Sequence, residues 1–110
     1  MSELARLEVE PRGAELVASI HGEVDMSNAQ ELLDGIERAL PNEDVVLVVD
    51  LTHTTYLDSA GVQLLFTLAS RLRTRRRRMK VVVPESSHVR TVLEITAVSQ
   101  VIPVEARLEG

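Results

Sequence analysis

Residues 45–62 read VVLVVDLTHTTYLDSAGV, and this stretch decides the fold. Its first part, residues 45–51, is an apolar run that only Asp50 interrupts. A run of this kind lacks the polar alternation of a half-exposed strand and is typical of a strand buried on both faces of a helix-covered sheet. Residues 52–58 are polar and predict a loop, and the apolar spacing that begins at Val62 predicts an amphipathic helix. A buried strand followed by a helix indicates an α/β fold.

The residues before this stretch predict a hairpin and a first helix. Residues 4–10 alternate between apolar and polar, which is the period of a strand, and residues 14–20 predict a second strand after a Pro-Arg-Gly turn. Apolar residues then recur along one helical face until a proline ends the helix. The cap of that helix is predicted either as Asp25 or as a capping box of Ser27 and Gln30.

Two strands and a helix are expected after the central stretch. Residues 79–83 are rich in valine and predict a strand, and the apolar spacing after Pro84 predicts a third helix. Residues 101–104 predict a last strand, which Pro103 places near a sheet edge. The order β-β-α-β-α-β-α-β predicts a single small α/β domain over residues 1–110, with a mixed, mostly parallel sheet of about five strands and helices mainly on one face.

The composition agrees with one independently folding domain. The chain has 110 residues, of which 45% are hydrophobic, enough for a core of its own. The absence of cysteine excludes disulfides and thiolate metal ligands. The first residues are charged and lack the apolar run of a signal peptide, and no apolar stretch is long enough to span a bilayer. We therefore expect a cytoplasmic protein without membrane insertion.

The net charge of −5 conceals an uneven distribution. Seven of the 12 basic residues lie within residues 71–80, where no acidic residue occurs, and the rest of the chain has a net charge of −12. We expect this run to be a solvated helix C-terminus, where cations complement the helix dipole. Docking of an acidic partner is a second interpretation, and a nucleic-acid-binding regulator that uses residues 71–78 is a third. The acidic remainder and the 2% aromatic content disfavour direct nucleic-acid binding.

Ser59 lies at the predicted start of a helix, after a loop that follows a buried strand. The first backbone N–H groups of a helix have no intrahelical partner, and the helix dipole makes this end partly positive. Asp58 or Ser59 can therefore cap these groups, and a phosphate on Ser59 would find surroundings suited to an anion. Position alone leaves the cap and the phosphorylation site both open, and a cap is the commoner role.

Three motifs resemble the anti-sigma-factor antagonist family, the bacterial STAS domains. The sequence YLDSAGV at residues 56–62 is similar to the family's signature, in which Asp, Ser, a small residue and Gly begin a helix. The sequence GEVD at residues 22–25 is similar to the turn after the family's second strand, and VRTVLE at residues 89–94 is similar to its third helix. The motifs occur in matching order, so the resemblance extends over nearly the whole chain.

The resemblance implies a switch protein rather than an enzyme. Members of the family bind an anti-sigma factor that is also a serine kinase, and they regulate transcription indirectly. Phosphorylation of the serine that corresponds to Ser59 releases this partner, and a PP2C-type phosphatase restores binding. No cofactor is implied. The residues implied for the switch region are Gly22, Asp25, Asp58, Ser59, Ala60 and Gly61.

Three positions depart from the family pattern. Ala60 replaces the serine or threonine that often follows the phosphorylated serine. Four arginines at residues 75–78 replace a turn that commonly contains glycine, and Ala97 occupies another position where glycine is usual. A related role within the same fold therefore stays open. The chain would then be a constitutive STAS subunit of a larger complex, such as a phospholipid-transport ABC complex or a stress-signalling scaffold.

Other residues invite a catalytic or metal-binding interpretation that their spacing does not support. His21, His53 and His88 are far apart in the sequence and no cysteine accompanies them, so we expect surface or loop roles rather than metal ligands. A serine hydrolase would need Gly-x-Ser-x-Gly, but Leu57 occupies the first glycine position around Ser59. No Walker-type phosphate loop is present in the sequence. We expect neither an enzyme nor a bound cofactor.

Overall fold

The computed structural model describes residues 4–108 and contains six strands and four helices within them. Two short elements, a strand and a helix, are additions to the predicted order. None of the described helices combines the length and the apolar character that a bilayer span requires. In chain order the elements are β1 (Ala5–Arg12), β2 (Glu15–Val24), α1 (Ala29–Ala39), β3 (Val46–Asp50), β4 (Thr54–Leu57), α2 (Ser59–Thr74), β5 (Met79–Val82), α3 (His88–Ile95), α4 (Val98–Val101) and β6 (Val104–Glu105).

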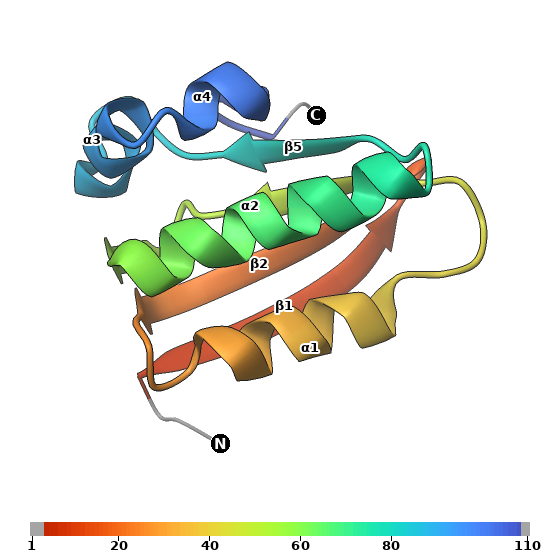
Figure 1. Cartoon of the computed structure of the whole chain (residues 1–110), viewed down its shortest axis with the longest axis horizontal. Helices are drawn as coiled ribbons and strands as arrows, with labels where there is room; N and C mark the ends of the chain where they lie inside the picture. Colours follow the sequence, from red (N-terminus) through yellow and green to blue (C-terminus); the bar gives the residue numbers. More distant parts are fainter. Residues whose placement is uncertain (1–3, 109–110) are drawn as a thin grey trace.

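The sheet is mixed and mostly parallel, as the sequence predicts (Figure 1). Its strand order is β1-β2-β3-β5-β6, and the β1–β2 hairpin is antiparallel whereas the other pairs are parallel. β2 is long enough to hold two further strands in succession. It pairs with β3 from Glu15 to Ser19 and with β4 from Gly22 to Val24. The helix that follows β4 therefore starts beside the end of β2.

The helices pack on one face of the sheet, which confirms the prediction. α1 and α2 lie side by side across this face (Figure 1). α3 packs against β4 and α4, and α4 also contacts α2. Burial of each aliphatic side chain stabilises the fold by about 1.5–3 kcal/mol, and these side chains hold the two layers together. Fully buried examples from β2, β3, α2, α3 and the end of α4 are Ile20, Leu47, Leu65, Leu93 and Ile102.

The opposite face of the sheet explains why the central run lacks polar alternation. Leu47 and Val49 of β3 point into the core under the helices, whereas Val48 belongs to a second, smaller cluster on the other side. Val17 and Val82 from the flanking strands complete this cluster. β3 is therefore buried on both faces, as predicted.

Residues 52–58, which the sequence predicts as a loop, contain strand β4. Thr54 and Leu57 are buried and Thr55 and Tyr56 are exposed, so the segment lacks the alternation that identifies a strand. Its threonines and tyrosine favour extended backbone, and pairing with β2 completes the strand.

The predicted last strand at residues 101–104 is wrong at its start. Val98–Val101 form helix α4, and β6 comprises only Val104–Glu105. Pro103 has no N–H to donate to a ladder, although its carbonyl accepts a hydrogen bond from the Val81 N–H at 2.9 Å. The strand therefore begins only after the proline.

The predicted capping box of α1 is also wrong. Asn28 is the N-cap residue, and its side chain makes no capping bond to the helix. Ser27 Oγ donates to Asp25 Oδ1 at 2.5 Å, and Gln30 Nε2 donates to Asp34 Oδ1 at 2.9 Å. These polar side chains bond to nearby acids instead of to the orphan N–H groups of the helix.

Candidate functional site

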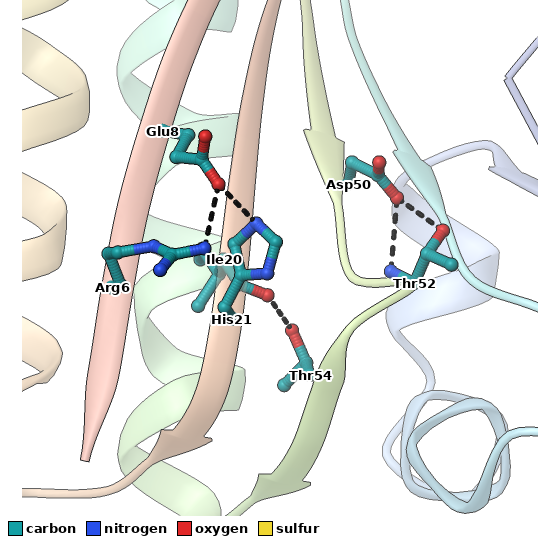
Figure 2. A network of polar contacts seen from close by, with 7 residues as sticks. All are labelled: Arg6, Glu8, Ile20, His21, Asp50, Thr52 and Thr54. Carbon is teal, nitrogen blue, oxygen red and sulfur yellow. Dashed lines mark hydrogen bonds and ion pairs between the residues drawn. The ribbon is translucent and has the colours of Figure 1, made fainter.

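Strand β4 is fixed to the sheet by buried polar contacts at its start. Thr54 is buried, and its Oγ1 donates a hydrogen bond to the carbonyl of Ile20 in β2 at 2.7 Å (Figure 2). The turn before it is closed by Asp50, whose Oδ1 accepts from the Thr52 N–H at 3.0 Å and from Thr52 Oγ1 at 2.5 Å. Because buried polar groups without partners are costly, these bonds hold the turn between β3 and β4 in one shape.

A polar cluster lies beside the same turn on the outer face of β2. His21 Nε2 lies 2.8 Å from Glu8 Oε1, which Arg6 Nη2 contacts at 3.0 Å (Figure 2). The His21 ring stacks on His53, with centroids 5.0 Å apart and planes 8° from parallel. This pair was not predicted, because the two histidines are far apart in the sequence and only the pairing of distant segments brings them together. The Gly22 N–H donates to the His53 carbonyl at 3.0 Å.

The pairing of β2 with β4 brings two acidic loops to one end of the sheet. Val24 pairs with Leu57, and the Val24 carbonyl accepts a hydrogen bond from the Asp58 N–H at 3.2 Å. Asp25 and Asp58 are the next residues on the two strands. The strand pairing therefore places the two aspartates at the same end of the sheet.

Asp58 is the N-cap of α2. Its Oδ1 accepts hydrogen bonds from the Ala60 N–H at 2.8 Å and from the Gly61 N–H at 3.3 Å. Ser59 is the first residue of the helix and is exposed. The sequence leaves Asp58 and Ser59 open as the cap of this helix, and in the structure Asp58 is the cap. The Ser59 hydroxyl is not needed for capping.

Two glycines set the backbone positions of these loops. A Cβ on Gly61 would lie 2.3 Å from Leu57 Cδ1, so a side chain there would force either Leu57 or the start of α2 to move. Gly22 has a φ of +99°, and a Cβ on it would lie 2.1 Å from the backbone oxygen of Leu4. That oxygen also accepts a hydrogen bond from the Glu23 N–H at 2.8 Å, which fixes the close approach.

The loop before α1 is ordered by its own polar groups. Asp25 Oδ1 accepts hydrogen bonds from Ser27 Oγ and from the Ser27 N–H, and these two bonds lower the pKa of Asp25 below its ordinary value. Asn28 is buried, with Nδ2 donating to the Glu23 carbonyl at 2.8 Å and Oδ1 accepting from the Asp25 N–H at 3.1 Å. Asn28 is therefore a positioning residue that the sequence analysis did not identify.

A groove of about 250 Å³ runs between the first turns of α1 and α2. Met26 at this groove is 86% exposed, and an exposed methionine is typical of adaptable protein-binding surfaces. The groove was not predicted from the sequence, although the apolar Met26 within a polar loop was an available signal. The groove is lined by Met26, Ala29, Gln30, Leu33, Ala60, Gln63, Leu64 and Thr67.

The charged residues of the two loops at this end of β2 and β4 are acidic. Neither the residues that line the groove nor the described loops at residues 25–28 and 58–61 include a lysine or an arginine. Asp25 and Asp58 contribute two carboxylates, and Asp58 already occupies two of the first N–H groups of α2. A phosphate on Ser59 would thus find no lysine or arginine with which to pair among these groove and loop residues.

The site at the start of α2 is suited to binding another protein and to covalent modification of a side chain. Within residues 4–108, no three histidine, aspartate or glutamate side chains are placed to hold a metal ion together. The site offers an exposed hydroxyl, a partly apolar groove and a backbone fixed by close packing. It can bind a protein surface, and an added charge can alter that binding.

Comparisons with known proteins agree with this arrangement. The sequence model of the family described as "Mlab, STAS domain" matches residues 7–104. The anti-sigma-B factor antagonist of Listeria monocytogenes is 30% identical over 91 residues, which cover 83% of this chain and 78% of that protein.

Two solved structures have the same fold. The crystal structure of an anti-sigma factor antagonist from Mycobacterium paratuberculosis matches with a TM-score of 0.83 and 25% identity, covering 94% of this chain and 87% of that chain. The anti-sigma factor antagonist SpoIIAA in its unphosphorylated form matches with a TM-score of 0.74 and 18% identity, covering 93% of this chain and 90% of that chain. The residues matched by the family include both acidic loops, the groove and Ser59. The chain belongs to the STAS domain family.

Proposed function

We propose that this protein is an anti-sigma-factor antagonist and that phosphorylation of Ser59 switches off its binding to an anti-sigma factor. The observation that carries the proposal is the exposed Ser59 at the start of α2, next to a groove with an exposed methionine. The names of the Listeria relative and of the mycobacterial structure support the same role. The protein would act by binding rather than by catalysis.

The groove between α1 and α2 is the proposed docking surface. Met26 is largely exposed, so a partner that covers it removes apolar surface from water. Gln30, Gln63 and Thr67 surround it with neutral hydrogen-bonding groups. Ala60 lines the groove and follows Ser59 directly in the chain, so a partner in the groove would come close to Ser59.

A phosphate would oppose docking through its charge. It adds about −1.5 to −2 next to Asp58 and close to the Asp25 loop. The helix dipole offsets only part of this repulsion, because Asp58 already accepts from the Ala60 and Gly61 N–H groups. A partner surface shaped for a hydroxyl would have to desolvate the phosphate unpaired, so a loss of affinity on the order of 10³ is expected.

The remaining residues of the proposed switch region position this hydroxyl. Gly22 and Gly61 allow the close backbone approaches, and Asp25 and Asp58 order the two loops. The partners would be an anti-sigma factor that is also a serine kinase, and a PP2C-type phosphatase that removes the phosphate from Ser59.

The test combines modification with binding. After incubation with ATP, Mg²⁺ and a candidate anti-sigma kinase, mass spectrometry should find one phosphate, on Ser59. Ser59→Ala should bind the kinase constitutively, and Ser59→Asp should bind it weakly. Ser70→Asp is the matched control, since it adds the same charge at an exposed position of α2 outside the groove and should bind like the unmodified protein. Equal affinities for the two Ser59 variants would instead favour a constitutive subunit of a larger complex.

A further inference from the structure

The end of α2 opposite Ser59 carries unpaired positive charge. The helix has 16 residues, so its two ends lie roughly 23 Å apart at about 1.5 Å per residue. Two arginines here have structural partners: Arg71 pairs with Glu37, and Arg77 donates to two carbonyls of the α1–β3 loop at 2.7 and 2.8 Å. The guanidinium groups of four others make no hydrogen bond or ion pair with any residue in the range 4–108. These four arginines are Arg73, Arg75, Arg76 and Arg78.

At this end of α2 an arginine occupies a backbone conformation that favours glycine. The Arg77 N–H donates to the Leu72 carbonyl at 2.8 Å, and the Arg76 N–H donates to the Arg73 carbonyl at 2.9 Å. This pattern is a Schellman motif, whose left-handed position is usually filled by glycine. Arg76 occupies that position with a φ of 58°. Since glycine would suit the fold better, the guanidinium at this position points to a role outside the fold.

A groove of about 260 Å³ lies among these arginines. Its lining includes Arg73, Arg76 and Arg78 together with the apolar residues Ala69, Met79 and Val101. Val101 is 45% exposed, so the apolar part of the lining is open to solvent. The groove thus combines apolar surface with guanidinium groups that can each form paired hydrogen bonds to a carboxylate.

We propose that this groove binds an acidic peptide segment of a partner protein. An aliphatic side chain of that segment would contact Met79 and Val101, and its carboxylates would pair with Arg73, Arg76 and Arg78. A concave, partly apolar lining of this size suits a peptide side chain better than the flat surface of a bilayer. This second surface lies beyond the one proposed for the Ser59 switch and does not depend on it.

Nucleic acid fits this surface less well. Residues outside the basic run have a net charge of −12, which repels an extended polyanion. Tyr56 and Phe66, the aromatic residues of the chain, do not line the groove, so bases would find nothing on which to stack.

The experiment measures binding of a labelled synthetic peptide of alternating glutamate and leucine by fluorescence anisotropy at low salt. Arg76→Gly is the decisive variant, because it removes the guanidinium while relieving the backbone strain. It should bind the peptide about three- to tenfold more weakly than the unmodified protein and melt at a higher temperature. Arg75→Gln removes the same charge from the same turn, but Arg75 does not line the groove, so this control should bind almost normally.

Further binding measurements separate the apolar from the ionic contribution and test whether the Ser59 site is involved. A glutamate–serine peptide should bind more weakly than the glutamate–leucine peptide, and Ser59→Asp should bind both peptides as the unmodified protein does. The proposal is overturned if Arg76→Gly binds normally, if Arg75→Gln weakens binding equally, or if the two peptides bind alike. Tighter binding of a DNA duplex or of phosphatidylglycerol vesicles than of the peptide would also overturn it.

Discussion

The two ends of α2 are built in opposite ways. At the start of the helix, Asp58 accepts two backbone N–H groups and Gly61 brings the helix against Leu57. At the other end, Arg76 occupies a left-handed conformation, and four guanidinium groups have no partner within the described residues. The helix dipole favours an anion at the first end and cations at the second, so both ends are electrostatically favourable.

The difference lies in how each end is held. The first end is fixed by strand pairing, glycine contacts and a cap, whereas at the second end Arg76 occupies a backbone conformation that disfavours a side chain. A change at the first end should therefore destabilise the protein, and a suitable change at the second end should stabilise it. The four predictions below test this contrast.

Gly22→Ala should have the largest effect, a loss of about 3–5 kcal/mol in the free energy of unfolding. The new Cβ would meet the Leu4 backbone oxygen at 2.1 Å, and the φ of +99° adds strain. Gly13→Ala is the matched control, with a φ of +63° and nothing within 4 Å of its Cβ, and it should cost only about 1 kcal/mol. Urea unfolding measures both variants, and equal losses would show that the close approach at Gly22 is unimportant.

Asp58→Ala should cost about 1–2 kcal/mol, because two N–H groups at the start of α2 lose their acceptor. Ser87→Ala provides the comparison, since Ser87 caps α3 through a single bond from the Val89 N–H at 3.1 Å. We expect a smaller loss there. The same unfolding experiment would contradict the role of Asp58 if the α3 variant were the less stable of the two.

Arg76→Gly should stabilise the protein by about 1 kcal/mol, since glycine adopts a φ of 58° without strain. Differential scanning calorimetry should show a melting temperature about 4 °C higher. Arg75→Gly, at a φ of −93°, should give no such gain. A lower melting temperature for Arg76→Gly would mean that the side chain of Arg76 stabilises the fold through contacts.

Most strands and helices and the start of α2 could be predicted from the sequence, because they depend on local periodicity and local capping. The alternation in residues 4–10, the continuous apolar run before Asp50 and the helical spacing after Val62 identify elements that the structure contains. The start of α2 was also predictable, since an Asp-Ser pair before an apolar helix offers the caps that helix N-termini need. The structure has Asp58 as that cap and an exposed Ser59.

The features that the sequence did not predict depend on contacts between distant segments. Strand β4 exists because Val24 pairs with Leu57, and the buried role of Asn28 exists because the Glu23 carbonyl and the Asp25 N–H both reach its side chain. The groove at Met26 likewise needs two helices to meet. No periodicity within one segment encodes these contacts.

Backbone conformation was predictable only as a departure from a pattern. The resemblance to the family implies a glycine within the turn at residues 75–78 and another at Ala97, and Arg76 and Ala97 adopt positive φ, 58° and 64°. The resemblance identified Ala97 and the four-residue turn, but which arginine is left-handed follows from how α2 ends.

The smallest expected effect concerns the titration of Asp25 at the start of the switch region. Bonds from Ser27 lower its pKa in the folded protein, whereas the unfolded chain has the ordinary value of about 3.9. The resulting stabilisation is complete above that value and is lost as the pH falls through the lowered pKa. Ser27→Ala removes the hydroxyl donor but keeps the N–H donor, so carboxyl NMR should show the midpoint of Asp25 moving part of the way back. An unchanged midpoint would mean that the hydroxyl bond is absent in solution. Because Asp25 is ionised at neutral pH in either case, the acidic surroundings of Ser59 do not depend on Ser27.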